Sequence, residues 1–184
     1  MKNGLRGLAA AVALLPAASM AENLSYNYLE GGFAFYPDFE SQDFIGLDTR
    51  GSVALHENIF AFGGFKYLTD DVDLTALHAG AGYRHGLDAR TDIWGGLTME
   101  YQEYDWDRGG EVDDTGLGFR AGIRHQLNND LELGIGGRVV SGDLDYVGFT
   151  GTARYAIEPD FKLFAELDVY DGEPGILGGA TFEF

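Results

Sequence analysis

The first half of the chain contains three side chains of the types that hydrolases use, namely Asp48, Ser52 and His78. A nucleophilic serine needs a histidine base within hydrogen-bond reach and an acid that orients that histidine. The segments that carry Ser52 and His78 are not consecutive, and no nucleophile motif surrounds Ser52. We therefore predict no catalytic residue and no cofactor. The three side chains are interpreted as polar groups packed in an interior.

Acidic clusters are the second chemical signal. Asp70-Asp71-Val72-Asp73 and the set Asp105, Asp107, Asp113 and Asp114 could collect Ca²⁺ or Mg²⁺ through hard oxygen ligands. Neither cluster has the spacing of a calcium-binding loop, so we predict solvated acidic loops and no metal site. A weaker hypothesis is that divalent cations bridge these acids to the phosphates of lipopolysaccharide.

The elements that must position these groups are strands. Apolar and polar residues alternate with period two along the chain, most clearly in the hairpin from Leu117 to Val139 with its Asn128-Asn129-Asp130 turn. The pattern predicts ten strands, at about 24–36, 44–55, 59–68, 74–86, 92–104, 115–127, 131–140, 146–157, 161–170 and 176–184. Lys66 and the pair Phe60 and Phe62 share one face of 59–68, so the register of that strand stays open. Eight strands are the alternative.

Tight turns and longer acidic loops alternate between these strands. This arrangement is typical of an up-and-down antiparallel barrel with short turns at one end and loops at the other. With an even number of strands, both termini lie at the turn end.

The charges inside the strands fall on the polar face and balance. They comprise eight cations and eight anions, which we predict to form a charge network: Glu30, Asp48, Arg50, Lys66, Arg84, Asp92, Glu100, Arg120, Arg124, Glu132, Arg138, Arg154, Lys162, Glu166, Asp168 and Glu183. The chain as a whole has a net charge of −18. Neutrality of one face is expected of an enclosed lumen, where unpaired charges are unfavourable by several kcal/mol. Cations facing lipid would be unfavourable by roughly 2–4 kcal/mol each. We therefore predict a transmembrane barrel with its apolar face outward; a soluble exported barrel of lipocalin type is the alternative.

Tyrosines near strand ends are expected to mark the membrane–water interfaces. The nine assigned to this belt are Tyr26, Tyr28, Tyr36, Tyr67, Tyr83, Tyr101, Tyr104, Tyr155 and Tyr170. Trp106 is the one loop residue suited to contact a partner, and it is equally suited to an interfacial anchor.

The N-terminus has the features of a secretory signal peptide. Residues 1–21 comprise a basic start, the apolar run Leu8–Leu15 and the small-residue site Ser19-Met20-Ala21, which leaves 22–184 as one barrel domain. A transmembrane helix is the alternative, but the apolar run is too short. The acidic net charge argues against binding to nucleic acid.

Three stretches resemble small outer-membrane β-barrels of Gram-negative bacteria. They are Tyr26 to Phe33, Gly82-Tyr83-Arg84-His85, and the terminal Thr181-Phe182-Glu183-Phe184. The opening stretch resembles a family of proteins of similar length once described as secreted quorum-sensing factors. The resemblance implies an outer-membrane location and an assembly signal at Phe182 and Phe184, read by the barrel-assembly machinery. Within this group, the barrels that are similar to OmpA have eight strands. The ten strands counted here depart from that number.

Function is predicted only at the level of class. We expect a monomeric outer-membrane barrel, in contact with lipid and lipopolysaccharide, whose charge-paired lumen is largely filled and whose role is structural. The alternative is a narrow, porin-like channel for small solutes or cations. A lipid-modifying enzyme is a more distant third.

Overall fold

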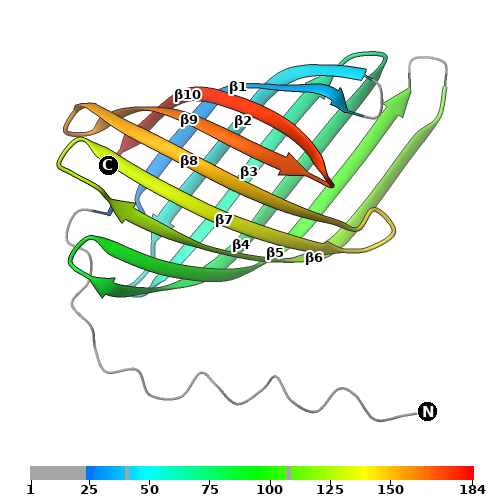
Figure 1. Cartoon of the computed structure of the whole chain (residues 1–184). Coiled ribbons are helices and arrows are strands. Elements are labelled where there is room, and N and C mark those ends of the chain that lie inside the picture. The colour runs from blue at the N-terminus through cyan, green and yellow to red at the C-terminus, as the bar shows by residue number, and fades with distance from the viewer. Residues whose placement is uncertain (1–23, 40–41, 107–108) are drawn as a thin grey trace, which may run out of the picture.

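The computed structural model describes residues 24–39, 42–106 and 109–184, and these form a closed antiparallel barrel of ten strands (Figure 1). Each strand pairs with its neighbours in sequence, and β1 pairs with β10. The strands are β1 Tyr28–Phe39, β2 Gln42–Ala54, β3 Ile59–Thr69, β4 Val72–Asp88, β5 Thr91–Trp106, β6 Glu111–Gln126, β7 Leu131–Ser141, β8 Tyr146–Glu158, β9 Phe161–Tyr170 and β10 Glu173–Glu183. The predicted ten-stranded up-and-down barrel is confirmed.

The predicted signal peptide, residues 1–21, lies outside the described residues. Within the described ranges, no helix is long and apolar enough to cross a membrane.

Several strands are longer at the loop end than the alternation predicted. β4, β5 and β6 have 17, 16 and 16 residues, and they pair as far as Val72 opposite Trp106 and Asp105 opposite Glu111. Much of what was predicted as acidic loop is therefore strand. Near the loops, beyond the lipid-facing part of the barrel, both faces of a strand are polar. The alternation of apolar and polar residues is therefore lost there, although the backbones remain paired.

The first strand differs from the prediction at its other end. It begins at Tyr28 rather than at residue 24, and Leu24 and Tyr26 are buried. Residues 24–27, the N-terminal segment, form no strand and contact the interior of the barrel at its turn end.

The outer face is apolar all round the barrel. Its most exposed large side chains include Phe33, Leu97, Leu117, Ile135 and Leu167, which are 63–70% exposed and come from five different strands. The sixteen predicted network residues lie on the inner face, where each makes at least one ion pair. This sidedness is that of a membrane-spanning barrel, and it is opposite to the sidedness of a soluble lipocalin-type barrel.

Inward glycines make room for large side chains of neighbouring strands. A Cβ atom on Gly82 would come within 2.5 Å of the Phe60 ring, and one on Gly96 within 2.7 Å of the Phe62 ring. These contacts also settle the register of β3: Phe60 and Phe62 point inward together with Lys66. The glycines thus accommodate aromatic rings, and also charged side chains such as Arg138 beside Gly148 and Glu100 beside Gly118.

The tyrosine belt was only partly correct. Tyr83 and Tyr155 face outward and are more than half exposed, as predicted. Tyr26, Tyr36 and Tyr170 are buried inside the barrel, because strand parity turns them to the same face as the charges. Two further belt residues, Tyr28 and Tyr104, also contact interior residues.

Candidate functional site: the barrel lumen

The lumen is occupied by a network of ion pairs contributed by all ten strands. At its centre Arg50 on β2 lies 3.0 Å from a carboxylate oxygen of each of Glu30, Asp48 and Glu166. Arg50 is the most accessible cation of the network, with 22% of its side chain exposed, whereas Glu30 is 1% exposed. The guanidinium therefore faces the open part of the lumen and its acids lie behind it.

A second group lies toward the loop end around Asp168 on β9. Arg138 donates two hydrogen bonds to this carboxylate, with N–O distances of 2.8 and 3.1 Å, and Lys66 lies 3.0 Å from it. The Tyr36 hydroxyl donates to Asp168 at 2.5 Å and accepts a hydrogen bond from Lys66. Four strands are thereby connected through one buried acid.

A third group lies toward the turn end around Glu132 on β7. Arg124 donates to it at 2.8 and 3.1 Å, Arg154 at 3.2 Å and Lys162 at 3.5 Å. Glu132 is 1% exposed, so removing it would leave three cations in an enclosed space.

The turn end of the lumen is closed by the N-terminal segment. The ring of Tyr26 lies between the guanidinium groups of Arg84 and Arg124, at 4.5 and 4.7 Å from its centroid, and packs against Phe60 at 4.7 Å. The same two arginines donate hydrogen bonds to the carbonyl oxygens of Leu24 and Ser25. Cation–π contacts and these bonds hold the segment in place as a floor.

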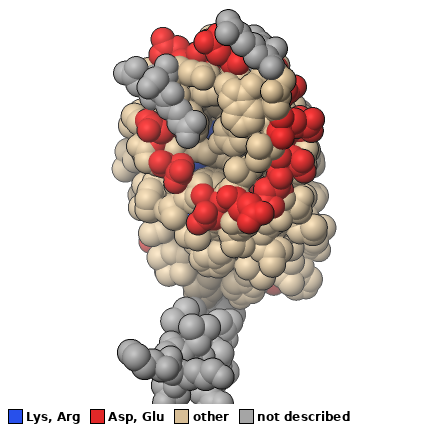
Figure 2. Space-filling model, turned by 90° about the vertical axis from the view of Figure 1, so that its right-hand side faces the viewer, with Lys and Arg blue, Asp and Glu red and all other residues tan. Residues whose placement is uncertain are grey.

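The loop end is hollowed and surrounded by acids. Figure 2 shows Asp and Glu side chains around the opening, with Lys or Arg atoms visible in its depth. We call this the acidic rim; its exposed members are Asp70, Asp71, Asp105, Glu111, Asp113, Asp143, Asp145 and Asp171. On one side, the opening is narrowed by a buried layer that includes Tyr36, Phe44, Leu74 and Tyr170.

Asp114, beyond the apolar belt, organises one loop of this rim. Its carboxylate accepts hydrogen bonds from the backbone N–H groups of Leu144, Asp143 and Thr115 at 3.1, 2.6 and 2.7 Å. These bonds, chiefly that from Leu144, lower the pKa of Asp114 below its ordinary value.

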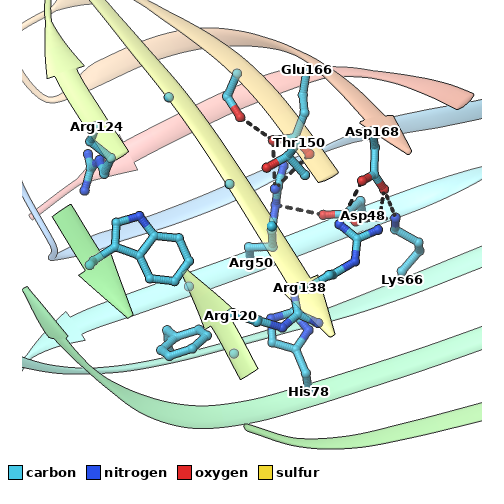
Figure 3. A pocket seen from close by; sticks show the side chains of 18 of the residues that line it. Asp48, Arg50, Lys66, His78, Arg120, Arg124, Arg138, Thr150, Glu166 and Asp168 are labelled. Carbon is cyan, nitrogen blue, oxygen red and sulfur yellow. Dashed lines mark hydrogen bonds and ion pairs between the residues drawn. The ribbon is translucent and has the colours of Figure 1, made fainter. Parts of the chain in front are cut away.

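Between the floor and the rim lies a cavity of about 160 Å³. Arg50, Arg120 and Arg138 point into it from three strands, with His78 and Thr150 (Figure 3). Gly134 and Gly136 leave the wall at β7 without side chains. The aromatic part of the lining includes Tyr26, Tyr28, Phe60, Phe62 and Trp94 toward the floor, and Tyr146 and Tyr170 toward the rim.

The arrangement of Asp48, Ser52 and His78 is not that of a hydrolase. Ser52 is opposite Phe62 in the β2–β3 register, whereas His78 is opposite Gly64 in the β3–β4 register, level with Arg50. Within the described ranges, the Ser52 hydroxyl is buried without a hydrogen-bond partner. Asp48 contacts Arg50 and Lys66 instead of His78.

The acidic clusters do not converge on a metal-binding geometry. Among residues 24–39, 42–106 and 109–184, no group of three or more His, Asp or Glu side chains is arranged to hold a metal ion. Asp107 lies outside the described residues. Phe182 and Phe184, the predicted assembly signal, are exposed on or next to the last strand, at 53% and 67%.

The aromatic lining was not identified from the sequence. Strand parity could have found it, since Phe60 and Phe62 alternate with Lys66, and Trp94 alternates with Asp92. The facing of Phe60 and Phe62 was left open, and Trp94 was assigned to neither face. The glycines that make room for these rings lie on neighbouring strands. They can be recognised only when the strand register is known.

No protein-family model and no curated protein sequence matches this chain. Solved structures with a similar arrangement include the KdgM porin in complex with disordered oligogalacturonate, at 12% identity and a TM-score of 0.49, with 85% of this chain and 99% of that one covered. The N-terminal β-barrel domain of Pseudomonas aeruginosa OprF has 15% identity, a TM-score of 0.47, and coverage of 86% and 98%. The Yersinia pestis attachment invasion locus protein Ail has 10% identity, a TM-score of 0.44, and coverage of 85% and 95%. Likenesses of this degree leave the ligand and the activity of this chain unassigned.

Proposed function

We propose that this protein is a structural barrel of the outer membrane of a Gram-negative bacterium, with a lumen that does not conduct. The single observation that carries the proposal is the closed charge network. Its acids are at most 14% exposed, each is ion-paired, and Tyr26 closes the turn end between two arginines. A wide, hydrated pore would leave such charges accessible to water.

The outer-membrane location is supported by the continuous apolar exterior and by the aromatic C-terminus. The predicted signal peptide would deliver the chain across the inner membrane, and the exposed Phe182 and Phe184 would be available to the barrel-assembly machinery. The same exterior supports the proposed contact with lipid and lipopolysaccharide.

A narrow channel is the second candidate, because the lumen opens through the acidic rim. Conductance across a planar lipid bilayer separates the two roles. We expect the mature protein to give no discrete steps. Steps that change in the separate Glu100→Ala and Arg120→Ala variants would instead identify a pore lined by those side chains.

The N-terminal segment supplies the matched variant for this experiment. Tyr26→Ala removes the ring between Arg84 and Arg124, and we expect it to produce discrete conductance steps in a barrel that is otherwise silent. Leu29→Ala, which changes an outward side chain of the adjoining strand, is the control and should remain silent.

A further inference from the structure

The accessible surface of the lumen is more basic than its composition suggests. The described residues make thirteen ion pairs, and in twelve of them the side chain of the cation is more exposed than that of the acid. Arg120 is 16% exposed and its partner Glu100 is 4% exposed. A molecule that enters the cavity therefore meets guanidinium and ammonium groups, although the network is neutral overall.

Two arginines lie directly opposite each other on this surface. Arg120 on β6 is the register partner of Arg138 on β7. Like charges at directly opposed positions destabilise a sheet, and each of these cations is bound by its acid on the side away from the other. Arg120 binds Glu100 through its Nε and Nη2 atoms. An anion placed between the two guanidinium groups would relieve this repulsion.

The strand wall of the same cavity is left open on the turn side of the two arginines, at Gly134, the register partner of Arg124. A Cβ atom on Gly134 would meet its nearest neighbours at 3.7 to 3.9 Å, which is ordinary van der Waals contact. Close packing therefore does not require glycine at this position, and a glycine inside a strand can mark a place where a ligand approaches the backbone. The cavity of about 160 Å³ is more than tenfold the ~10–15 Å³ that one ordered water needs.

Aromatic rings lie next to Arg120 in the same cavity. The ring of Phe62 lies 6.2 Å from the His78 ring and 6.1 Å from Trp94. His78 is the register partner of Glu100, the acid that binds Arg120. Aromatic rings, inclined to one another by 58° and 71°, thus line the cavity from the level of Arg120 toward the floor.

We propose that the lumen binds a small organic monoanion, an aromatic carboxylate in chemical class. Its carboxylate lies between Arg120 and Arg138, and its ring packs against Phe62 and Trp94. Such a ligand enters past the acidic rim, which repels anions in proportion to their charge. The rim therefore selects a monoanion over a multiply charged one, and the cavity excludes polymers because it is smaller than the roughly 300–1,000 Å³ typical of sites for drug-sized ligands. The site does not depend on whether the barrel conducts.

The test is a fluorescence titration of the refolded mature protein in detergent micelles. The sequence has two tryptophans, so Trp106→Phe leaves Trp94 as the only reporter in the lumen. We expect a saturable change with benzoate at millimolar concentrations, and binding at least about tenfold weaker for neutral benzyl alcohol and for the dianion phthalate, a difference of about 1.4 kcal/mol.

Two variants locate the site. The double substitution Arg120→Gln with Glu100→Gln removes one pair without leaving a buried charge, and should weaken benzoate at least about tenfold. Gly134→Leu fills the cavity and should abolish binding. Its control, Gly151→Leu, adds the same side chain on the outer face, where a Cβ atom has nothing within 4 Å, and should bind like the parent. Folding of each variant is checked by the heat-dependent shift of the barrel on a gel.

Three outcomes would overturn the proposal. The first is the absence of a saturable response to benzoate below about 10 mM, where any affinity is already very weak. The second is equal affinity for benzoate and benzyl alcohol, and the third is unchanged binding in the folded double variant. Any one of them would identify the cavity as a water-filled space.

Discussion

Removing Glu132 should destabilise the barrel far more than removing an acid at its surface. In a Glu132→Gln variant, the carboxylate that faces Arg124, Arg154 and Lys162 becomes a neutral amide whose NH₂ group must point at a cation. Breaking a buried charge pair by removing one partner typically raises the free energy of the folded state by about 3–5 kcal/mol.

The contacts of Glu132 lead to a similar magnitude. Arg124 donates two hydrogen bonds to the carboxylate, at 2.8 and 3.1 Å. Hydrogen bonds to charged groups contribute about 1.5–3 kcal/mol each, so the loss of these two alone corresponds to about 3–6 kcal/mol. If the lumen were wide and hydrated, the same pairs would behave like exposed salt bridges and contribute about 0–1 kcal/mol.

The measurement is the free energy of unfolding in urea, followed by tryptophan fluorescence of the barrel in lipid vesicles. Glu158→Gln is the matched control, since Glu158 is an exposed acid at the end of β8, and it should change the free energy by less than about 0.5 kcal/mol. A Glu132→Gln variant within about 1 kcal/mol of the parent would refute the enclosed lumen.

Four further perturbations have defined outcomes. The pKa of Asp114 is lower in the folded chain than in the unfolded chain, where it is about 3.9. The ionised Asp114 side chain therefore stabilises its loop fully above about pH 3.9, and this stabilisation is lost as the pH falls through the folded-state pKa. Pepsin should cleave the β7–β8 loop increasingly over that interval, whereas Asp114→Asn should be cleaved at higher pH as well. Gly82→Leu should lower the free energy of unfolding by at least about 1–3 kcal/mol through overlap with Phe60, while Gly151→Leu should leave it nearly unchanged; equal effects would contradict the inward packing. Phe184→Ala should slow folding by reconstituted barrel-assembly machinery without lowering equilibrium stability, because Phe184 is 67% exposed; a normal assembly rate would remove it from the signal. Ca²⁺ should raise the melting temperature of the refolded protein only when lipopolysaccharide is present, and unchanged melting in both series rejects bridging by the acidic rim.

The amino-acid sequence by itself determined the architecture of this protein. Alternation with period two specifies strands, and the tight turns at Asn128-Asn129-Asp130 and elsewhere specify an antiparallel meander. The equal numbers of cations and anions on one face indicated which face lies inside, because charge balance is a requirement of an enclosed space. These properties depend on local geometry and on composition, so they can be read without knowing which strands are neighbours across the barrel.

The partners inside the lumen were decided only by the tertiary structure. Arg154 reaches Glu30 across 124 positions of the sequence, and Arg50 reaches Glu166 across 116. Parity assigns each of these charges to the inner face, but the stagger of the closed barrel determines which ones meet. For the same reason, Tyr26 could be predicted at a strand end but not as the floor of the lumen. Its position depends on Arg84 on β4 and Arg124 on β6, the strands on either side of β5, which lie far along the chain from residue 26.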